Sequence, residues 1–212
     1  MLGVGAYAFP CDPDQSPLDA PALWSPDICP ATLILEENLA AGMRPHGAKI
    51  SAIEGVIAEC HQRDGRHLVI ADDQGHHRLW LRRASTAHGH AFTILADKHF
   101  DARIAVAKRL MRKLDGRRSG PLPSSFTPTL FQHGRLTLLL RLLDSERSGA
   151  NRRDMAFTIL FRNHAPLTNA QWKGSSARRR TQRMLAQAHH LMAIGYRSLV
   201  SGRLPVALMG RH

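Results

Sequence analysis

The spacing of apolar residues changes near residue 97, from short runs typical of strands to the longer period typical of helices. Before that point, apolar runs alternate with turn sequences such as Arg63-Asp64-Gly65 and Asp72-Asp73-Gln74-Gly75. Apolar runs on both sides of Asp/Gly turns are typical of β-hairpins, so we expect a small antiparallel meander. The expected strands lie within residues 31–35, 50–58, 66–71, 77–81 and 91–95.

After residue 98, apolar residues recur every three or four positions, which predicts helices. In the first of them, Asp97 is the expected N-cap and Gly116 the stop signal. A proline-rich linker follows, and a second helix is expected to begin with Thr127 as N-cap and Pro128 in its first turn. Gly149 ends this helix. Its expected apolar face consists of Leu130, Leu136, Leu139, Leu140, Leu142 and Leu143.

Two further helices complete the chain. Asn151 is a suitable N-cap for a helix over residues 152–161, and Ser175 or Ser176 for a long one over 176–201. The fold class is therefore expected to be α+β, with the antiparallel meander packed against a C-terminal helical bundle. We divide the chain into a β-rich region, 1–96, and a helical, basic region, 97–212, and expect both to belong to one continuous compact unit.

Charge is distributed unevenly along the chain, whose net charge is +12. The first 100 residues contain 8 Lys+Arg and 12 Asp+Glu, whereas residues 101–212 contain 21 and 5. A positive field on one part of a molecule suits a polyanion. The three cysteines, an odd number and widely spaced, favour a reducing, cytoplasmic location. They form no C-x-x-C pair, which disfavours a zinc ribbon. No apolar run is long enough for a membrane span, so no membrane partner is expected.

Arginines gather at the start of the last predicted helix, which with the helix before it resembles a helix-turn-helix joined by a long loop. Basic groups there can contact phosphates and guanine edges, and capping serines with free amides can bind a phosphate. The alternative, a solvated charged face, normally mixes both signs of charge. The candidate DNA-binding residues are Arg152, Arg153, Lys173, Ser175, Ser176, Arg178, Arg179, Arg180 and Arg183.

Several segments of the C-terminal half resemble a known family. They are Ser148-Gly149-Ala150-Asn151-Arg152-Arg153-Asp154-Met155-Ala156, Trp172-Lys173-Gly174-Ser175-Ser176, and the stretch from Arg178 to Gly195-Tyr196-Arg197-Ser198-Leu199. They are similar to the DNA-binding domain of RovC-type transcription regulators. The upstream segments Asp12-Pro13-Asp14, Ala20-Pro21-Ala22-Leu23-Trp24 and Leu79-Trp80-Leu81 also resemble this family, so that the resemblance covers about residues 10–201. The resemblance implies a DNA-binding transcription activator that acts as a homo-oligomer on type VI secretion genes, with double-stranded DNA as partner and RNA polymerase as a further candidate.

Other function classes fit the sequence less well. The 13 histidines include no H-E-x-x-H spacing, and no nucleophile elbow, P-loop or dinucleotide fingerprint occurs. We therefore expect no catalytic residues, no cofactor and no metal. RNA is disfavoured because no RNP aromatics or GXXG loop are present. A protein-interaction or anti-activator module that does not touch DNA is the alternative, since the acidic N-terminal half suits a protein partner.

Overall fold

The computed structural model describes residues 6–8, 16, 19–36, 54–82 and 90–203. The chain divides into two compact units, which are described separately. The first contains residues 1–127 with 200–202, and the second contains 128–199 with 203–212. The expected strand over 50–58 lies partly outside the described residues.

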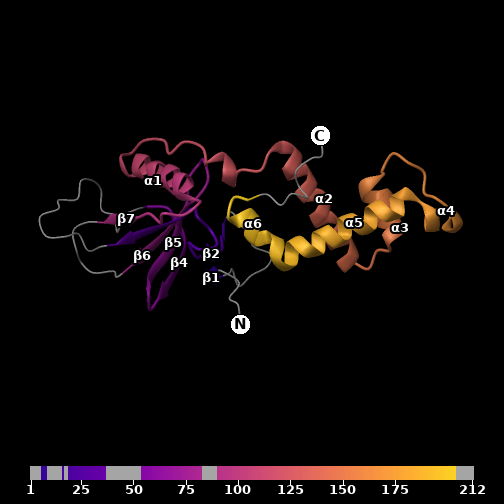
Figure 1. Cartoon of the computed structure of the whole chain (residues 1–212), viewed down its shortest axis with the longest axis horizontal. Helices are drawn as coiled ribbons and strands as arrows, with labels where there is room; N and C mark the ends of the chain where they lie inside the picture. Colours follow the sequence, from indigo (N-terminus) through magenta and orange to yellow (C-terminus); the bar gives the residue numbers. More distant parts are fainter. Residues whose placement is uncertain (1–5, 9–15, 17–18, 37–53, 83–89, 204–212) are drawn as a thin grey trace, which may run out of the picture. The chain divides into compact units, whose positions relative to one another are not determined.

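A five-stranded sheet with the strand order β4-β5-β6-β3-β7 forms the first unit (Figure 1). The antiparallel hairpins β4–β5 and β5–β6 confirm the meander. β3, however, pairs in parallel with β6, with Leu33 opposite Leu79, and antiparallel with β7. The expected α+β class is confirmed, but the sequence did not predict this parallel pairing, because it joins segments far apart in the sequence. The strands are β3 Thr32–Glu36, β4 Val56–Gln62, β5 Gly65–Ile70, β6 His77–Arg82 and β7 Ala91–Thr93, beside a two-stranded sheet of β1 Ala6–Ala8 and β2 Leu23–Trp24.

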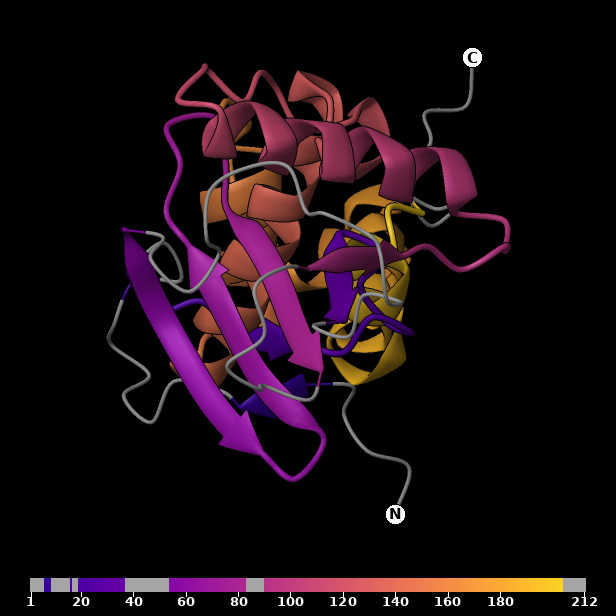
Figure 2. The ribbon, with the colours of Figure 1, turned by 90° about the vertical axis from the view of Figure 1, so that its left-hand side faces the viewer.

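Helix α1, Phe100–Leu114, packs against one face of this sheet (Figure 2). Alternate strand residues point to that face, as the two-residue period of a strand requires. The shared core consists of Leu33, Leu35, Leu68, Ile70, Leu79, Leu81, Val106, Ala107 and Leu110. Because α1 packs against the sheet, it belongs to the first unit, which extends to residue 127. The change of hydrophobic period alone suggested a division between residues 96 and 97.

The start of α1 differs from the expected cap. His99, and not Asp97, occupies the N-cap position. The Asp97 carboxylate accepts a hydrogen bond from the His99 amide at 2.9 Å and pairs with Arg103 at 3.1 Å. Asp97 therefore stabilises the turn before α1 and the buried side chain of Arg103. It lies two residues before the observed N-cap.

A buried polar cluster joins α1 to the turn between β5 and β6. The Asp72 carboxylate, whose side chain is 4% exposed, accepts a hydrogen bond from Ser119 Oγ at 2.6 Å. Its oxygens lie 3.0 Å from His77 Nε2, 3.7 Å from Arg109 Nη2 and 3.8 Å from Lys113 Nζ. Burial opposes ionisation of Asp72, but the hydrogen bonds from Ser119, the Gln74 amide and His77 hold its pKa well below the usual value. Burial also lowers the pKa of His77.

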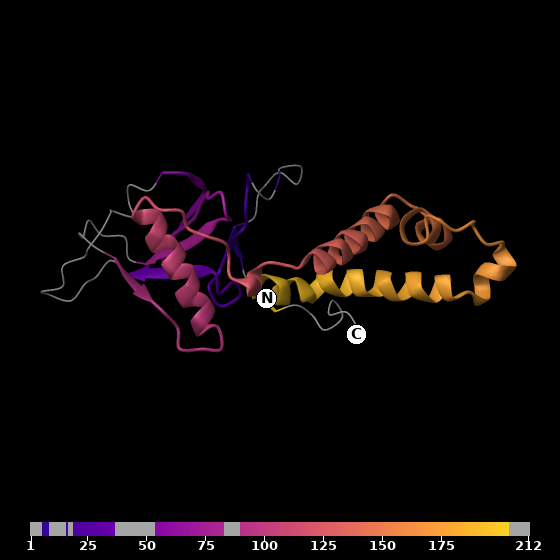
Figure 3. The ribbon, with the colours of Figure 1, turned by 90° about the horizontal axis from the view of Figure 1, so that it is seen from above.

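Helices build the second unit (Figure 3). Its core consists of Leu139, Leu142, Leu143, Met155, Leu185, Ala188 and Leu191. The long helix expected over 176–201 is confirmed as α5 Ser176–His190, the π-helical turn η4 Leu191–Gly195 and α6 Tyr196–Val200, and Figure 3 shows the first two as one rod. The preceding elements are α2 Leu130–Arg147, α3 Arg152–Met155, the π-helical turn η3 Ala156–Leu160, and α4 Asn169–Gly174, which the sequence did not predict.

Two expectations for α2 were wrong. Its N-cap is Thr129, which forms a reciprocal capping box with Gln132, and Thr127 instead ends the short 3-10 helix η2 Ser124–Phe126. Proline disfavours the helical region for the residue before it, which explains why Thr127 stays extended. Leu130 and Leu140 do not face the core, being 94% and 53% exposed. Across the described residues, no helix is long and apolar enough to cross a membrane.

Replacing Asp72 by Asn should destabilise the protein by about 3–5 kcal/mol, because it leaves the Arg109 charge buried without its partner. Since the folded pKa of Asp72 is lowered, the stabilisation is complete above its ordinary value of 3.8 and is lost as the pH falls below it. Urea unfolding followed by circular dichroism measures this difference across pH. The neighbouring exposed carboxylate gives the control Asp73→Asn, and equal stability of the two variants at pH 7 would contradict the role of the cluster.

Candidate nucleic-acid interface

Ser175 forms the junction between α4 and α5. It is the C-cap of α4 and the N-cap of α5, with the extended backbone angles φ −71° and ψ 150°. Its Oγ accepts a hydrogen bond from the Arg178 amide at 3.1 Å and donates one to the Trp172 carbonyl at 3.0 Å. Of the two serines expected as N-cap, Ser175 is therefore the one that caps α5. Ser176 follows as the first residue of α5, with an exposed side chain.

Two arginines in the first turn of α5 hold the end of α4. Arg178 Nη1 donates to the Lys173 carbonyl at 3.1 Å, and Arg179 Nη1 donates to the Gly174 carbonyl at 3.0 Å. Carbonyls in the last turn of a helix lack partners within the helix, so these guanidinium groups satisfy groups that would otherwise need water. Both arginines therefore fasten α4 to α5, a role that their position in the sequence did not reveal.

Arg180 lies over an aromatic cluster. Its guanidinium carbon is 5.6 Å from the centre of the Phe161 ring. Phe161 contacts Phe157, which in turn contacts Trp172 of α4 at a ring distance of 6.1 Å. Trp172 is thus a packing residue that joins η3 to α4. A cation over an aromatic face is attracted by about 0.5–1 kcal/mol at an exposed site, which favours one direction for the Arg180 side chain.

Arg153 also has a partner, because its Nη1 donates to Asn169 Oδ1 at 2.6 Å. This contact ties the start of α3 to the start of α4. Sequence reasoning missed Asn169 and Phe161 as positioning residues, since each meets its arginine only after the intervening loop folds. By contrast, Arg152, Lys173 and Arg183 are exposed, and no hydrogen bond or ion pair holds them within the described parts of the chain.

The exposed face of α5 carries Ser176, Arg179, Arg180 and Arg183, at the three- and four-residue spacing of one helix face. The opposite face buries Thr181, Leu185 and Ala188. We call this exposed set the arginine face. The structure thus brings three of the four arginines of α5 together on one side, opposite the side that packs against the core.

The charges of the second unit are strongly unbalanced. Residues 128–199 contain twelve Lys+Arg and three Asp+Glu, whereas residues 1–127 contain fifteen and fourteen. Two of the three carboxylates have other partners: Asp154 accepts from the Asn151 amide group, and Glu146 lies 2.7 Å from His189 Nε2. No described carboxylate pairs with the arginine face, so its positive field is not neutralised from within the unit.

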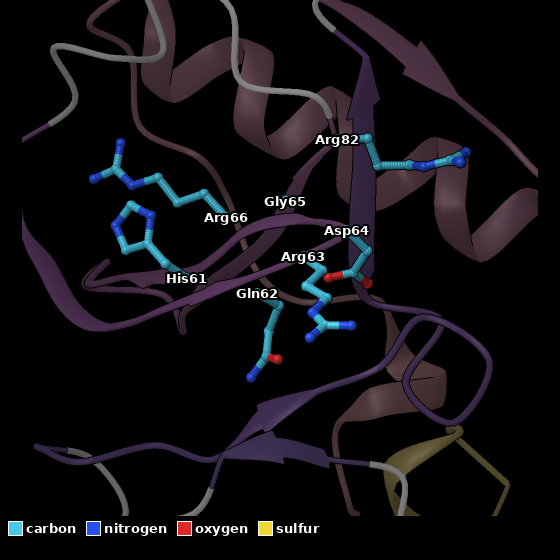
Figure 4. Close-up of a pocket in the computed structure, with 7 residues that line it drawn as sticks. All are labelled: His61, Gln62, Arg63, Asp64, Gly65, Arg66 and Arg82. Atoms are coloured by element: carbon cyan, nitrogen blue, oxygen red, sulfur yellow. The ribbon is translucent and has the colours of Figure 1, made fainter.

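A second basic region surrounds the tip of the β4–β5 hairpin, where a hollow of about 360 Å³ is lined by His61, Gln62, Arg63, Asp64, Gly65, Arg66 and Arg82 (Figure 4). Its cations are largely compensated. Arg66 donates two hydrogen bonds to Glu59, at 2.6 and 2.9 Å, and these hold the pKa of Glu59 below its usual value. Arg82 pairs with Glu36 at 3.0 Å. An anion would compete with these carboxylates, so this hollow is a weaker candidate.

Comparison with known families identifies the C-terminal half of the chain. The family model described as a type VI secretion transcription factor, DNA-binding domain (RovC), matches residues 93–201, which is just over half of the chain. The chain belongs to this family. The expected resemblance is thereby confirmed for residues 93–201, a range that includes α1 and the helices of the second unit, whereas the expected start near residue 10 lies outside the match.

The segment before this match, residues 48–92, matches a domain of unknown function, DUF7012. No curated protein and no solved structure matches the chain. Within the described residues, no group of three or more His, Cys, Asp or Glu side chains is placed to hold a metal ion. The family match over residues 93–201 points to DNA binding.

Replacing Ser175 by Ala should destabilise the second unit by about 1 kcal/mol, because the N-cap hydrogen bond of α5 is lost. The adjacent Ser176→Ala provides the control, since Ser176 is exposed and caps nothing; its effect should stay within about 0.5 kcal/mol. Urea unfolding followed by circular dichroism measures both. A larger loss of stability for Ser176→Ala than for Ser175→Ala would contradict Ser175 as the N-cap.

Proposed function

We propose that this protein is a DNA-binding transcription regulator that contacts the double helix with the arginine face of α5. The observation that carries the proposal is a helix face with three arginines and no paired carboxylate, inside the range that matches a transcription factor DNA-binding family. A solvated helix face normally carries both signs of charge, whereas a face of one sign suits the phosphate backbone.

In this mechanism the N-terminal end of α5 enters the major groove. Arg179, Arg180 and Arg183 contact phosphates and base edges, since guanidinium groups donate to the O6 and N7 atoms of guanine. The hydrogen bond from Arg179 to the Gly174 carbonyl leaves its other donors available, because a guanidinium group carries five. Ser176 and the free amides of the first turn offer a site for one phosphate. Ser175 would contribute by capping the helix, since its hydroxyl and its amide both donate to the Trp172 carbonyl.

The remaining cations set the position on the backbone. Arg152, Arg153 and Lys173 lie at the start of α3 and the end of α4 and would contact phosphates, while Arg178 acts chiefly on the junction through the Lys173 carbonyl. α3 with η3, α4 and α5 would together serve as the helix-turn-helix-like unit. The contact of Arg153 with Asn169 supports this, because it couples the first of these helices to the second.

The wider role is proposed from the family. We infer that the chain acts in the cytoplasm as an activator of type VI secretion genes, as a homo-oligomer that meets RNA polymerase, and that it is not an enzyme. The second candidate is a protein-interaction or anti-activator module without DNA contact. The first unit, with almost balanced charge, is the part that favours it. Fluorescence anisotropy with the duplex upstream of its own gene and a random-sequence duplex separates the two, because only a DNA-binding regulator would bind and prefer the former.

Replacing Arg180 and Arg183 together by Ala should lower the affinity for the upstream duplex tenfold or more, because each good contact contributes about 1–3 kcal/mol. Anisotropy titrations measure the loss. The matched control is Arg141→Ala with Arg147→Ala, which removes two exposed positive charges from α2 in the same unit. Equal losses for the two double variants would mean that only the total charge matters, and unchanged affinity of a folded Arg180/Arg183 variant would place the interface elsewhere.

A further inference from the structure

The first unit has a basic surface of its own at the C-terminal end of α1. Lys108 and Arg112 lie four residues apart on the helix, and Arg117 and Arg118 follow beyond its end; all four side chains are exposed. We call these four residues the α1 basic patch. It lies in the unit that does not contain the arginine face.

The backbone holds the last two cations in a defined place. Gly116 has φ +70°, a conformation that favours glycine, and its amide donates to the Lys113 carbonyl at 3.0 Å. The Arg117 amide donates to the Arg112 carbonyl at 2.8 Å. These two bonds close the helix as a Schellman-type end, so Arg117 and Arg118 leave α1 at a fixed angle.

The charge of the patch is not compensated nearby. Between residues 108 and 118, Asp115 is the single carboxylate among six Lys and Arg residues. The buried carboxylate of Asp72 forms ion pairs with Arg109 and Lys113 and does not neutralise the patch. Arg112 donates to the Ser119 carbonyl at 3.4 Å, which leaves its charge in place. In the described structure, no hydrogen bond or ion pair involves the side chains of Lys108, Arg117 or Arg118. Cations in the last turn stabilise a helix, but Arg117 and Arg118 lie outside that turn.

We propose that the α1 basic patch is a second DNA contact, which binds the phosphate backbone without reading bases. The inference rests on the proposed function of the arginine face, because a second contact on the same chain gains affinity when the first has already bound the duplex. The patch presents exposed side-chain charges at a helix C-terminus, where no free amides can bind a phosphate in a fixed orientation. Its contribution should therefore depend on salt and not on sequence.

The test compares two double variants of the full chain on duplexes of about 30 base pairs, roughly three helical turns. Arg117→Ala with Arg118→Ala removes half of the patch. Arg63→Ala with Lys98→Ala removes the same charge from exposed positions elsewhere in the first unit. Anisotropy titrations across salt, with the upstream and the random-sequence duplex, give the slope of log K against log salt for each. Circular dichroism melting establishes that all variants fold equally.

The Arg117/Arg118 variant should lose about 1.8 from the magnitude of that slope, at about 0.9 for each phosphate contact. Its affinity should fall by the same factor on both duplexes, whereas variants of the arginine face lose preference for the upstream duplex. An unchanged slope, or a slope lowered equally by Arg63/Lys98, would overturn the patch as a contact while leaving the arginine face intact. Absence of binding by the unmodified protein would overturn both proposals.

Discussion

The second unit depends on how the backbone groups at its helix ends find partners. Where α4 meets α5, one serine and two arginines satisfy these groups on both sides of the junction. These bonds determine the relation between a short helix, which would be unstable alone, and the long helix beside it. The aromatic cluster under Arg180 and the contact of Arg153 with Asn169 add further restraints on α4. The same side chains that give α5 its charge thus also hold it in place.

The two units secure their helices in different ways. In the first, a carboxylate buried between α1 and the β5–β6 turn gathers a serine, a histidine and two cations around it. Removing Asp72 takes away the partner that the other members share, so this cluster gives specificity to the packing of α1. In the second, the core cluster is made of leucine, methionine and alanine side chains, and no charged residue belongs to it. Arginine is buried in the first unit, as Arg109, and exposed in the second, as Arg183.

Local signals in the sequence were sufficient for much of the fold. Asn151, Ser175, Gly116 and Gly149 were correctly placed at helix ends, because a cap acts on amides or carbonyls only a few residues away. The parallel pairing of β3 with β6 could not be predicted, since it joins residues more than 40 positions apart. α4 was missed because six residues are too few for a hydrophobic period.

The same distinction applies to the candidate site. Clustering of arginines on one face of α5 follows from helix geometry and was predictable. Which of them already have partners was not, because the Phe161 ring and the α4 carbonyls come into reach only through the tertiary fold. Thr127 shows that even a local cap can be misplaced when a second candidate, Thr129, lies two residues away and has a better partner in Gln132.

In the proposed mode of binding, the length of the arginine face limits how much sequence one chain would read. From Ser176 to Arg183 a helix rises about 11 Å, close to the roughly 12 Å width of a major groove. Stacked base pairs are about 3.4 Å apart, so this stretch spans about three of them. Three base pairs recur by chance about once in every 64 positions, whereas a genome offers a million or more. A single copy therefore carries too little information to select one promoter, and a unique target requires several such faces on the same stretch of DNA.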